Sequence, residues 1–303
     1  MTALARLLSS IKRRVPPPLR GMGLMMFAAM MSMTMATIAK DLVQELPVFE
    51  VVFFRQLFGT LLLAPVLFRP GVNPLRTHRI GMHGLRALFN FVAILGYFTS
   101  LGLVPLAQIT ALGFTSPVFA SLLAVLVLGE AVRTPRMVGL LLGFAGALII
   151  LRPGFETVSA GSLYVLGSAA SWAVAMTCIK ALSRTETSVA ITFYAAFLQL
   201  PMALVAALFV WQWPSPGQLG LLLVISAIGT LAQISLSQAF READSTVVLP
   251  MDFTKLVWAS LLGYAVFAEI PDPWAWIGGL VVFSGVLWVA YSERRRRVAD
   301  GGE

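Results

Sequence analysis

The sequence predicts an all-α membrane protein of ten transmembrane helices, built as two inverted repeats of five helices with both termini in the cytoplasm. Three observations lead to this prediction. The 303 residues are 58% hydrophobic and only 12% charged, whereas soluble domains carry roughly 25% charged residues. Apolar runs of about 18 residues or more, long enough to cross a bilayer core, recur along the chain. The third observation is an internal duplication.

The duplication is clearest between residues 112–148 and 251–287, which align at a constant shift without a gap. Self-similarity at a fixed period marks a repeat architecture. The residues shared by the two segments are Phe114/Phe253, Thr115/Thr254, the Ala-Ser-Leu-Leu motifs at 120–123 and 259–262, Glu130/Glu269, Gly139/Gly278, Phe144/Phe283 and Gly146/Gly285. After a one-residue adjustment the earlier parts also pair, at Gly21/Gly161, Thr37/Thr177, Lys40/Lys180 and Phe53/Phe193.

Each repeat is expected to hold five helices, because a chain crossing lipid must satisfy its backbone polar groups within each segment. The expected spans are 20–40, 47–68, 82–104, 105–128, 134–151, 161–182, 188–210, 217–240, 246–268 and 273–291. The chain therefore divides into a basic N-terminus (1–19), a first repeat (20–151), a second repeat (161–291) and a basic tail (292–303).

Basic residues predict the orientation. One side of the ten-span arrangement receives both termini, the loops with Arg69, Arg76, Arg79, Arg133 and Arg136, the turn at 180–184 and Arg241. The other side receives only Lys40 and Arg152. Lysine and arginine gather in cytoplasmic loops, so both termini are expected in the cytoplasm. Because five is odd, the second repeat enters the membrane from the opposite side, as in many secondary transporters.

Two prolines are expected to disturb helices. Pro117 in span four and Pro250 in span nine each remove a backbone hydrogen bond and tend to kink the helix. The freed carbonyl groups could also contact a ligand.

The pattern resembles the drug/metabolite transporter superfamily, of the EamA type. The resemblance rests on the two five-span repeats, on fourth spans that end in Gly129-Glu130 and Ala268-Glu269, on small residues such as Gly139 and Gly146, and on Arg55 and Arg86 in the first repeat. It implies a ten-helix carrier of small organic solutes in the cell inner membrane, with a central cavity lined mainly by spans 1, 3, 4, 6, 8 and 9. Ala195 and Ser226 stand where the second repeat would match the two arginines, so equal roles in the two repeats are not expected.

Two polar stripes mark candidate walls of that cavity. The residues Arg86, Asn90, Ala93 and Tyr97 share one face of span three, and the matching face of span eight carries Ser226, Thr230, Gln233 and Ser237. We expect Asn90, Tyr97, Gln233 and Ser237 to contact the solute. The alternative is hydrogen bonding between helices, which such side chains commonly provide in membranes.

Asp252 and Lys255 on span nine form the sharpest candidate site. They lie three residues apart and can pair, and intramembrane charges are functional candidates by default. The alternative is a structural ion pair. Their repeat partners are Gly113 and Ser116, so the site is expected to be asymmetric.

The remaining candidates are aromatic or charged. Trp258, like Tyr97, could stack on a planar solute, although aromatic residues in apolar helices also serve packing. We expect structural or coupling roles for Arg55, Arg86, Glu130 and Glu269. The long side chain of Arg55 anchors span two or reaches the interface or a carboxylate, and the two glutamates lie at helix ends near the interface.

Enzyme signatures are missing from the sequence. It contains no HExxH motif and no Walker-type phosphate loop, and its single Cys178 has no histidine nearby. We therefore predict a secondary transporter, not an enzyme, that moves an amino-acid-like, nucleoside-like or vitamin-like solute by alternating access, without a metal or other cofactor. Two alternatives stay open: an intramembrane enzyme acting on a lipid-like substrate with Asp252 as general base, and a non-transporting receptor or assembly factor.

The expected partners are the small-molecule solute and the lipid bilayer. Nucleic acid is not expected, because the basic residues lie in short loops and at the chain ends. A coupling ion such as H⁺, carried by Asp252, and a homodimer are further options.

Overall fold

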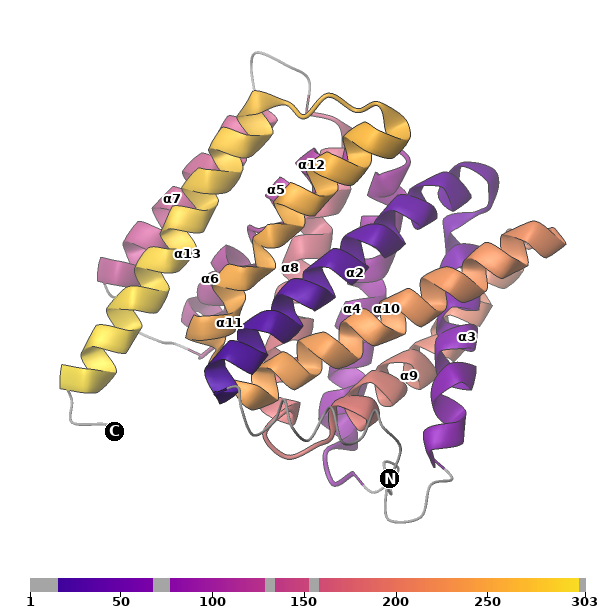
Figure 1. Ribbon diagram of the computed structural model, residues 1–303, viewed down its shortest axis with the longest axis horizontal. Helices are drawn as coiled ribbons and strands as arrows, with labels where there is room; N and C mark the ends of the chain where they lie inside the picture. The colour runs from indigo at the N-terminus through magenta and orange to yellow at the C-terminus, as the bar shows by residue number, and fades with distance from the viewer. Residues whose placement is uncertain (1–15, 68–76, 129–133, 153–157, 300–303) are drawn as a thin grey trace.

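A computed structural model of the protein describes residues 16–67, 77–128, 134–152 and 158–299, and all regular structure in these ranges is α-helical. Figure 1 shows the helices with their labels. In chain order they are α2 (Pro17–Glu45), α3 (Val48–Leu67), α4 (Ile80–Leu101), α5 (Leu106–Gly113), α6 (Ser116–Leu128), α7 (Thr134–Leu151), α8 (Ala160–Leu182), α9 (Ser188–Leu208), α10 (Pro216–Glu242), α11 (Ser245–Asp252), α12 (Thr254–Phe267) and α13 (Pro273–Ala299).

Several helix starts follow from local sequence. α8 and α9 begin after Ser159 and Thr187, whose hydroxyl groups accept hydrogen bonds from backbone N–H groups in the first turn. α10 begins with a capping box in which Ser215 and Gln218 satisfy each other's backbone N–H groups. Such caps fix where these largely apolar helices begin.

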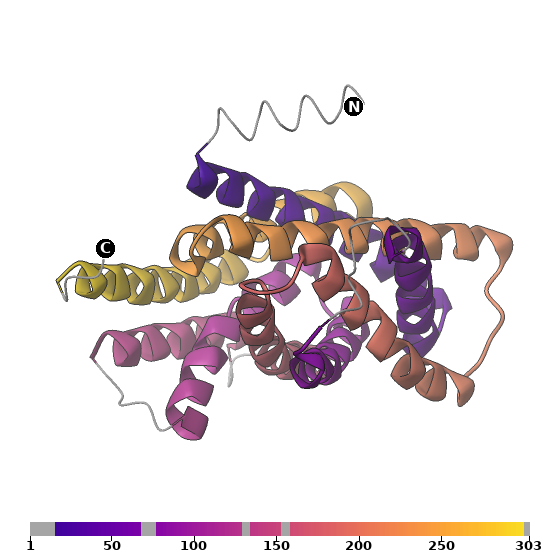
Figure 2. The ribbon, with the colours of Figure 1, turned by 90° about the horizontal axis from the view of Figure 1, so that it is seen from below.

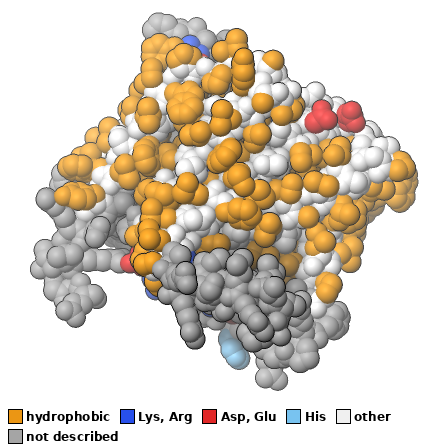
Figure 3. All heavy atoms as spheres, in the orientation of Figure 1, with side chains coloured by type: hydrophobic (Ala, Val, Ile, Leu, Met, Phe, Trp, Pro, Cys, Tyr) orange, Lys and Arg blue, Asp and Glu red, His pale blue; other side chains and the backbone are white. Residues whose placement is uncertain are grey.

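Six of the described helices, α2, α3, α4, α8, α9 and α10, are long and apolar enough to cross a membrane, and shorter apolar helices cover 106–120, 137–151 and 273–288. Large hydrophobic side chains are exposed along these helices. Figure 3 shows such side chains spread over the visible face of the molecule. An apolar outer surface of this extent fits a lipid environment.

Spans four and nine differ from the prediction of kinked single helices. Each consists of two helices, α5 and α6 in the first repeat and α11 and α12 in the second. The interruptions fall at Phe114-Thr115 and at Phe253, which occupy equivalent positions in the duplication, whereas Pro117 and Pro250 do not. The shared Phe-Thr sequence therefore marks the interruption more closely than proline does.

The two halves pack with two-fold symmetry. An added Cβ at Gly146 would lie 2.6 Å from the Gly278 carbonyl oxygen, and one at Gly285 would lie 3.1 Å from the Gly139 carbonyl oxygen. Gly139 and Gly146 of α7 are the repeat partners of Gly278 and Gly285 of α13, so exchanging the repeats converts one contact into the other. Figure 1 shows α7 and α13 side by side at one edge of the molecule.

Other helix pairs follow the same exchange. α2 packs along α10, and their repeat partners α8 and α4 also pack along each other. α3 packs against its own partner α9, where Gln56 donates a hydrogen bond of 2.9 Å to Gln199. Figure 2 shows the same bundle from a second direction. Every such pair joins one repeat to the other, so the two repeats form one body with a shared interior.

Candidate functional site: a cavity between the two repeats

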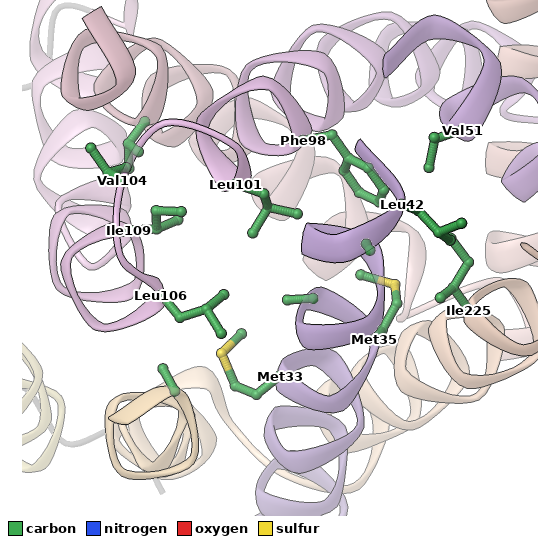
Figure 4. Packing of buried hydrophobic residues seen from close by; sticks show 14 of the residues in the cluster. Met33, Met35, Leu42, Val51, Phe98, Leu101, Val104, Leu106, Ile109 and Ile225 are labelled. Carbon is green, nitrogen blue, oxygen red and sulfur yellow. The ribbon is translucent and has the colours of Figure 1, made fainter. Parts of the chain in front are cut away.

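The shared interior contains a cavity of about 490 Å³. Its walls come mainly from α2, α4, α5, α6, α8, α10, α11 and α12, which correspond to spans 1, 3, 4, 6, 8 and 9. Beside the cavity lies the largest hydrophobic cluster, in which Met33 of α2 approaches Leu106 of α5 (Figure 4). Met33, Met35, Phe98 and Ile109 belong to this cluster and also line the cavity.

The two helix interruptions meet in the cavity wall. The Thr115 hydroxyl donates to the Leu112 carbonyl at 2.6 Å, and the Thr254 hydroxyl donates to the Met251 carbonyl at 2.8 Å. These are the same hydrogen bond in the two repeats, because both pairs of residues are repeat partners. The rings of Phe114 and Phe253 stack with centroids 3.9 Å apart, and both residues line the cavity. The interruptions are therefore a built, repeated feature of the wall.

Asp252 and Lys255 form the expected pair on the cavity wall. Lys255 Nζ lies 2.7 Å from Asp252 Oδ1 and donates to Oδ2 at 2.9 Å. Their side chains are 16% and 19% exposed. A carboxylate and an ammonium group are thus both available to a ligand, already neutralising each other.

The polar stripes divide between the cavity and the helix packing. Asn90, Tyr97 and Gln233 line the cavity. Ser237 is fully buried and lies outside the lining, as does Trp258, which packs against the main hydrophobic cluster. The structure brings the first three together with Asp252 and Lys255 but not the last two.

The two arginines lie deep in the bundle. Arg55 is 9% exposed and lines the cavity, with its guanidinium 6.0 Å from the centre of the Phe98 ring. Arg86 is fully buried and donates hydrogen bonds to the Ile191 carbonyl and, at 3.3 Å, to Gln233 Oε1. Arg86 thereby connects α4 with α9 and α10.

Glu269 joins three segments outside the cavity lining. It lies 2.6 Å from Lys40 Nζ and accepts a hydrogen bond of 3.0 Å from Leu106 N, the first residue of α5. Lys40 Nζ also donates to the Val104 carbonyl at 3.0 Å. Ala268 ends α12 in the left-handed conformation, with φ 54°. Glu130, the repeat partner of Glu269, lies outside the described residues.

Sequence reasoning left several wall residues unassigned. Lys180 and Trp172 of α8 line the cavity, as do the stacked Phe114 and Phe253. The duplication already contained a signal for most of them, because Phe114/Phe253 and Lys40/Lys180 are identities between the repeats. Within the described ranges, no three His, Cys, Asp or Glu side chains gather as a metal site would require.

Comparisons with known proteins agree with this architecture. The model of a family described as "EamA-like transporter family" matches residues 19–152 and 159–291. An S-adenosylmethionine uptake transporter of Rickettsia felis is 31% identical over 91% of this chain and 94% of its own length. A riboflavin transporter of Vibrio cholerae is 32% identical over 83% of this chain and 85% of its own.

Two further matches extend the comparison. A pseudopaline exporter of Pseudomonas aeruginosa is 32% identical over 91% of this chain and 97% of its own length. A solved crystal structure with 19% identity has a TM-score of 0.62 and covers 92% of this chain and 98% of that chain. The structural match supports the fold alone.

Proposed function

The chain belongs to the EamA-like transporter family, and from this premise we propose that it moves a small organic metabolite by exposing one central cavity to each side of the membrane in turn. Membership makes it a multi-pass inner-membrane protein and a transporter of small metabolites rather than an enzyme. We further propose the alternating mechanism, the ten membrane crossings and the cytoplasmic location of both termini.

One observation carries the mechanism: the 490 Å³ cavity lies between two halves whose contacts obey two-fold exchange. In an inverted repeat, exchanging the conformations of the halves turns a cavity that faces one side into one that faces the other. Such exchange requires that one end of the cavity be closed while the other is open. We infer that this cavity has one closed end and one open end.

At one end Lys40 and Glu269 hold α2, α5 and the end of α12 together. At the other end, exposed Thr177 and Lys180 of α8 line the cavity. Because basic residues gather in cytoplasmic loops, we assign the Lys180 end to the cytoplasm. The conformation described is then the cytoplasm-facing one, with the Lys40–Glu269 pair closing the opposite side.

The cavity suits a planar solute with polar substituents. Its volume falls within the roughly 300–1,000 Å³ of pockets for drug-sized ligands. Tyr97, Trp172, Phe114 and Phe253 offer ring faces, and the Asp252–Lys255 pair offers charges. S-adenosylmethionine and riboflavin, the solutes named for two relatives, both combine a fused ring with a polar chain. Amino-acid-like, nucleoside-like and vitamin-like solutes are the proposed classes.

Proton coupling through Asp252 is the energetic part of the proposal. In a vesicle assay, uptake should depend on a pH gradient in the wild-type protein and lose that dependence in Asp252→Asn. A gradient dependence that survives the substitution removes Asp252 as the proton carrier.

Homodimer formation stays a prediction, to be checked by chemical cross-linking in native membranes.

Uptake into proteoliposomes tests the function. Labelled S-adenosylmethionine, riboflavin and tryptophan would be offered separately, and the internal solute identified by chromatography. We expect uptake of at least one solute in unchanged form. Conversion of the solute would support the enzyme alternative, and no uptake above empty liposomes would support the receptor alternative.

A pair of glycine variants shows whether flux uses the cavity. Gly113 lines the cavity, and an added Cβ meets no atom within 4 Å, so the side chain of Gly113→Phe starts in open space and should occupy part of the cavity. Gly167 is equally unobstructed but lies on the exposed face of α8. Gly113→Phe should block uptake and Gly167→Phe should not. Equal uptake by the two variants contradicts transport through this cavity.

A further inference from the structure

Two guanidinium groups lie inside the bundle without a carboxylate. No hydrogen bond or ion pair involves Arg55 within the described part of the chain, and its Nε atom is buried and unpartnered. Among the described residues, Arg86 donates hydrogen bonds only to the neutral oxygens of Ile191 and Gln233, and its Nε is also unpartnered. A charge in a membrane interior is costly and normally pairs or faces water. An anion bound near these two side chains would offset their positive charge.

Both arginines line a small pocket. It has a volume of about 20 Å³, enough for about one water-sized group. Its lining contains arginines, amides, hydroxyl groups and small residues but no Asp or Glu: Arg55, Gln56, Gly59, Arg86, Asn90, Thr192, Ala195, Ala196, Gln199, Ser226, Gly229, Thr230 and Gln233. Two positive charges and several hydrogen-bond donors therefore surround a space that the described chain does not fill.

The small pocket adjoins the transport cavity. Arg55, Asn90 and Gln233 line both spaces, so a ligand in the cavity can reach the arginine from its open side. Asn90 Oδ1 is buried without a hydrogen-bond donor. It offers an acceptor to an N–H or O–H group beside the anion.

We propose that the part of the cavity beside this pocket is an anion subsite, in which Arg55 binds a carboxylate group of the transported solute while Arg86 adds a second positive charge behind it. The planar guanidinium fork of arginine matches a carboxylate with two parallel hydrogen bonds. The assignment rests on the proposed function, because it identifies the ligand as the transported solute.

Both arginines of the subsite come from the first repeat. Ala195 and Ser226 occupy the positions in the second repeat that correspond to Arg55 and Arg86. The positive charges therefore lie on one part of the cavity wall, and a solute whose carboxylate binds there has a fixed orientation relative to Asp252 and Lys255.

Thermal unfolding of the purified protein with formate as probe tests the proposal. Sodium formate replaces sodium chloride stepwise at constant ionic strength, and formamide serves as the neutral molecule of matching shape. We expect formate to raise the unfolding temperature with a saturating dose response, because a ligand of the folded state stabilises it, and formamide to have no effect. Arg55→Gln should abolish the formate response and Arg55→Lys should weaken it.

Arg152→Gln is the matched control, since Arg152 pairs with Asp272 outside the cavity at 2.7 Å. It should keep the full response to formate. Chloride and formate acting equally would overturn the carboxylate assignment in favour of an inorganic anion. An unchanged response in folded Arg55→Gln, judged by size-exclusion chromatography, would overturn the site itself.

The test separates this inference from the proposed function, because binding of formate requires no transport. A formate response without uptake of any solute removes the transport proposal and keeps the anion subsite. Uptake of a solute without an Arg55-dependent formate response removes the anion subsite and keeps the transport proposal.

Discussion

Replacing Glu269 with glutamine should loosen the closed end of the cavity. The carboxylate contacts Lys40 Nζ at 2.6 Å and Leu106 N at 3.0 Å, so one side chain holds α2, α5 and the end of α12 together. Glu269→Gln keeps the size of the side chain and an acceptor for Leu106 N. It removes the charge opposite Lys40.

The magnitude follows from burial. The Lys40 and Glu269 side chains are 10% and 17% exposed, so solvent screens the pair only weakly. Removing one partner of a buried pair costs about 3–5 kcal/mol. Because Lys40 keeps its hydrogen bond to the Val104 carbonyl, we expect a smaller loss, about 2–3 kcal/mol. The substitution Lys40→Met combined with Glu269→Gln should restore part of this loss.

Unfolding by sodium dodecyl sulfate in mixed micelles measures the change, and the double-mutant cycle isolates the pair. Asp272→Asn is the control, since Asp272 pairs with Arg152 but is 39% exposed, and exposed pairs contribute less than about 1 kcal/mol. If Glu269→Gln destabilises the protein no more than Asp272→Asn does, the pair does not hold this end closed.

Three further predictions concern the wall and the packing. Asp252→Asn and Lys255→Met should each reduce uptake in proteoliposomes. Membrane insertion, measured by the amount of folded protein in the membrane, should stay normal. Normal uptake by both variants would exclude the pair from the solute or coupling site. Gly146→Ala should destabilise the protein by about 1–3 kcal/mol, because its Cβ would lie 2.5 Å from Val282 Cγ2. Gly167→Ala, inside α8 and unobstructed, should instead be neutral or stabilise the protein by up to about 1 kcal/mol. Equal melting temperatures of the two variants would refute the close packing of α7 on α13. Ala268→Gly should stabilise the protein by a few tenths to about 1 kcal/mol, since glycine adopts the left-handed conformation at Ala268 without strain; a lower melting temperature would contradict this.

The duplication explains why much of the architecture was predictable. Family membership in two repeats was confirmed, and the shared Phe114/Phe253 and Gly146/Gly285 lie at helix interruptions and helix contacts. Residues that are identical in the two repeats indicate positions with the same structural role in each half. The Asp252–Lys255 pair was predictable for a different reason, because residues three apart on a helix are neighbours in any fold.

Contacts between distant segments were beyond the sequence pattern. Helical periodicity tells which residues share a face but not which helix that face meets, so the pairing of Glu269 with Lys40 could not be foreseen. It also does not tell where a cavity ends. Ser237 lies one turn beyond Gln233 on the same face, yet Gln233 lines the cavity and Ser237 is buried in packing. The sequence pattern likewise does not tell which side chains surround Arg55, so the lack of a carboxylate among its described neighbours became evident only from the structure.

Accessibility of a cysteine at position 113 tests alternating access most directly. The chain has one native cysteine, buried Cys178, and Cys178→Ser provides a background for Gly113→Cys or for Gly167→Cys on the exposed face of α8. A membrane-impermeant thiol reagent is added to right-side-out and to inverted vesicles. We predict labelling of Gly113→Cys from both sides and of Gly167→Cys from neither. Labelling of Gly113→Cys from one side only, or from neither, would contradict a cavity that opens to each side in turn.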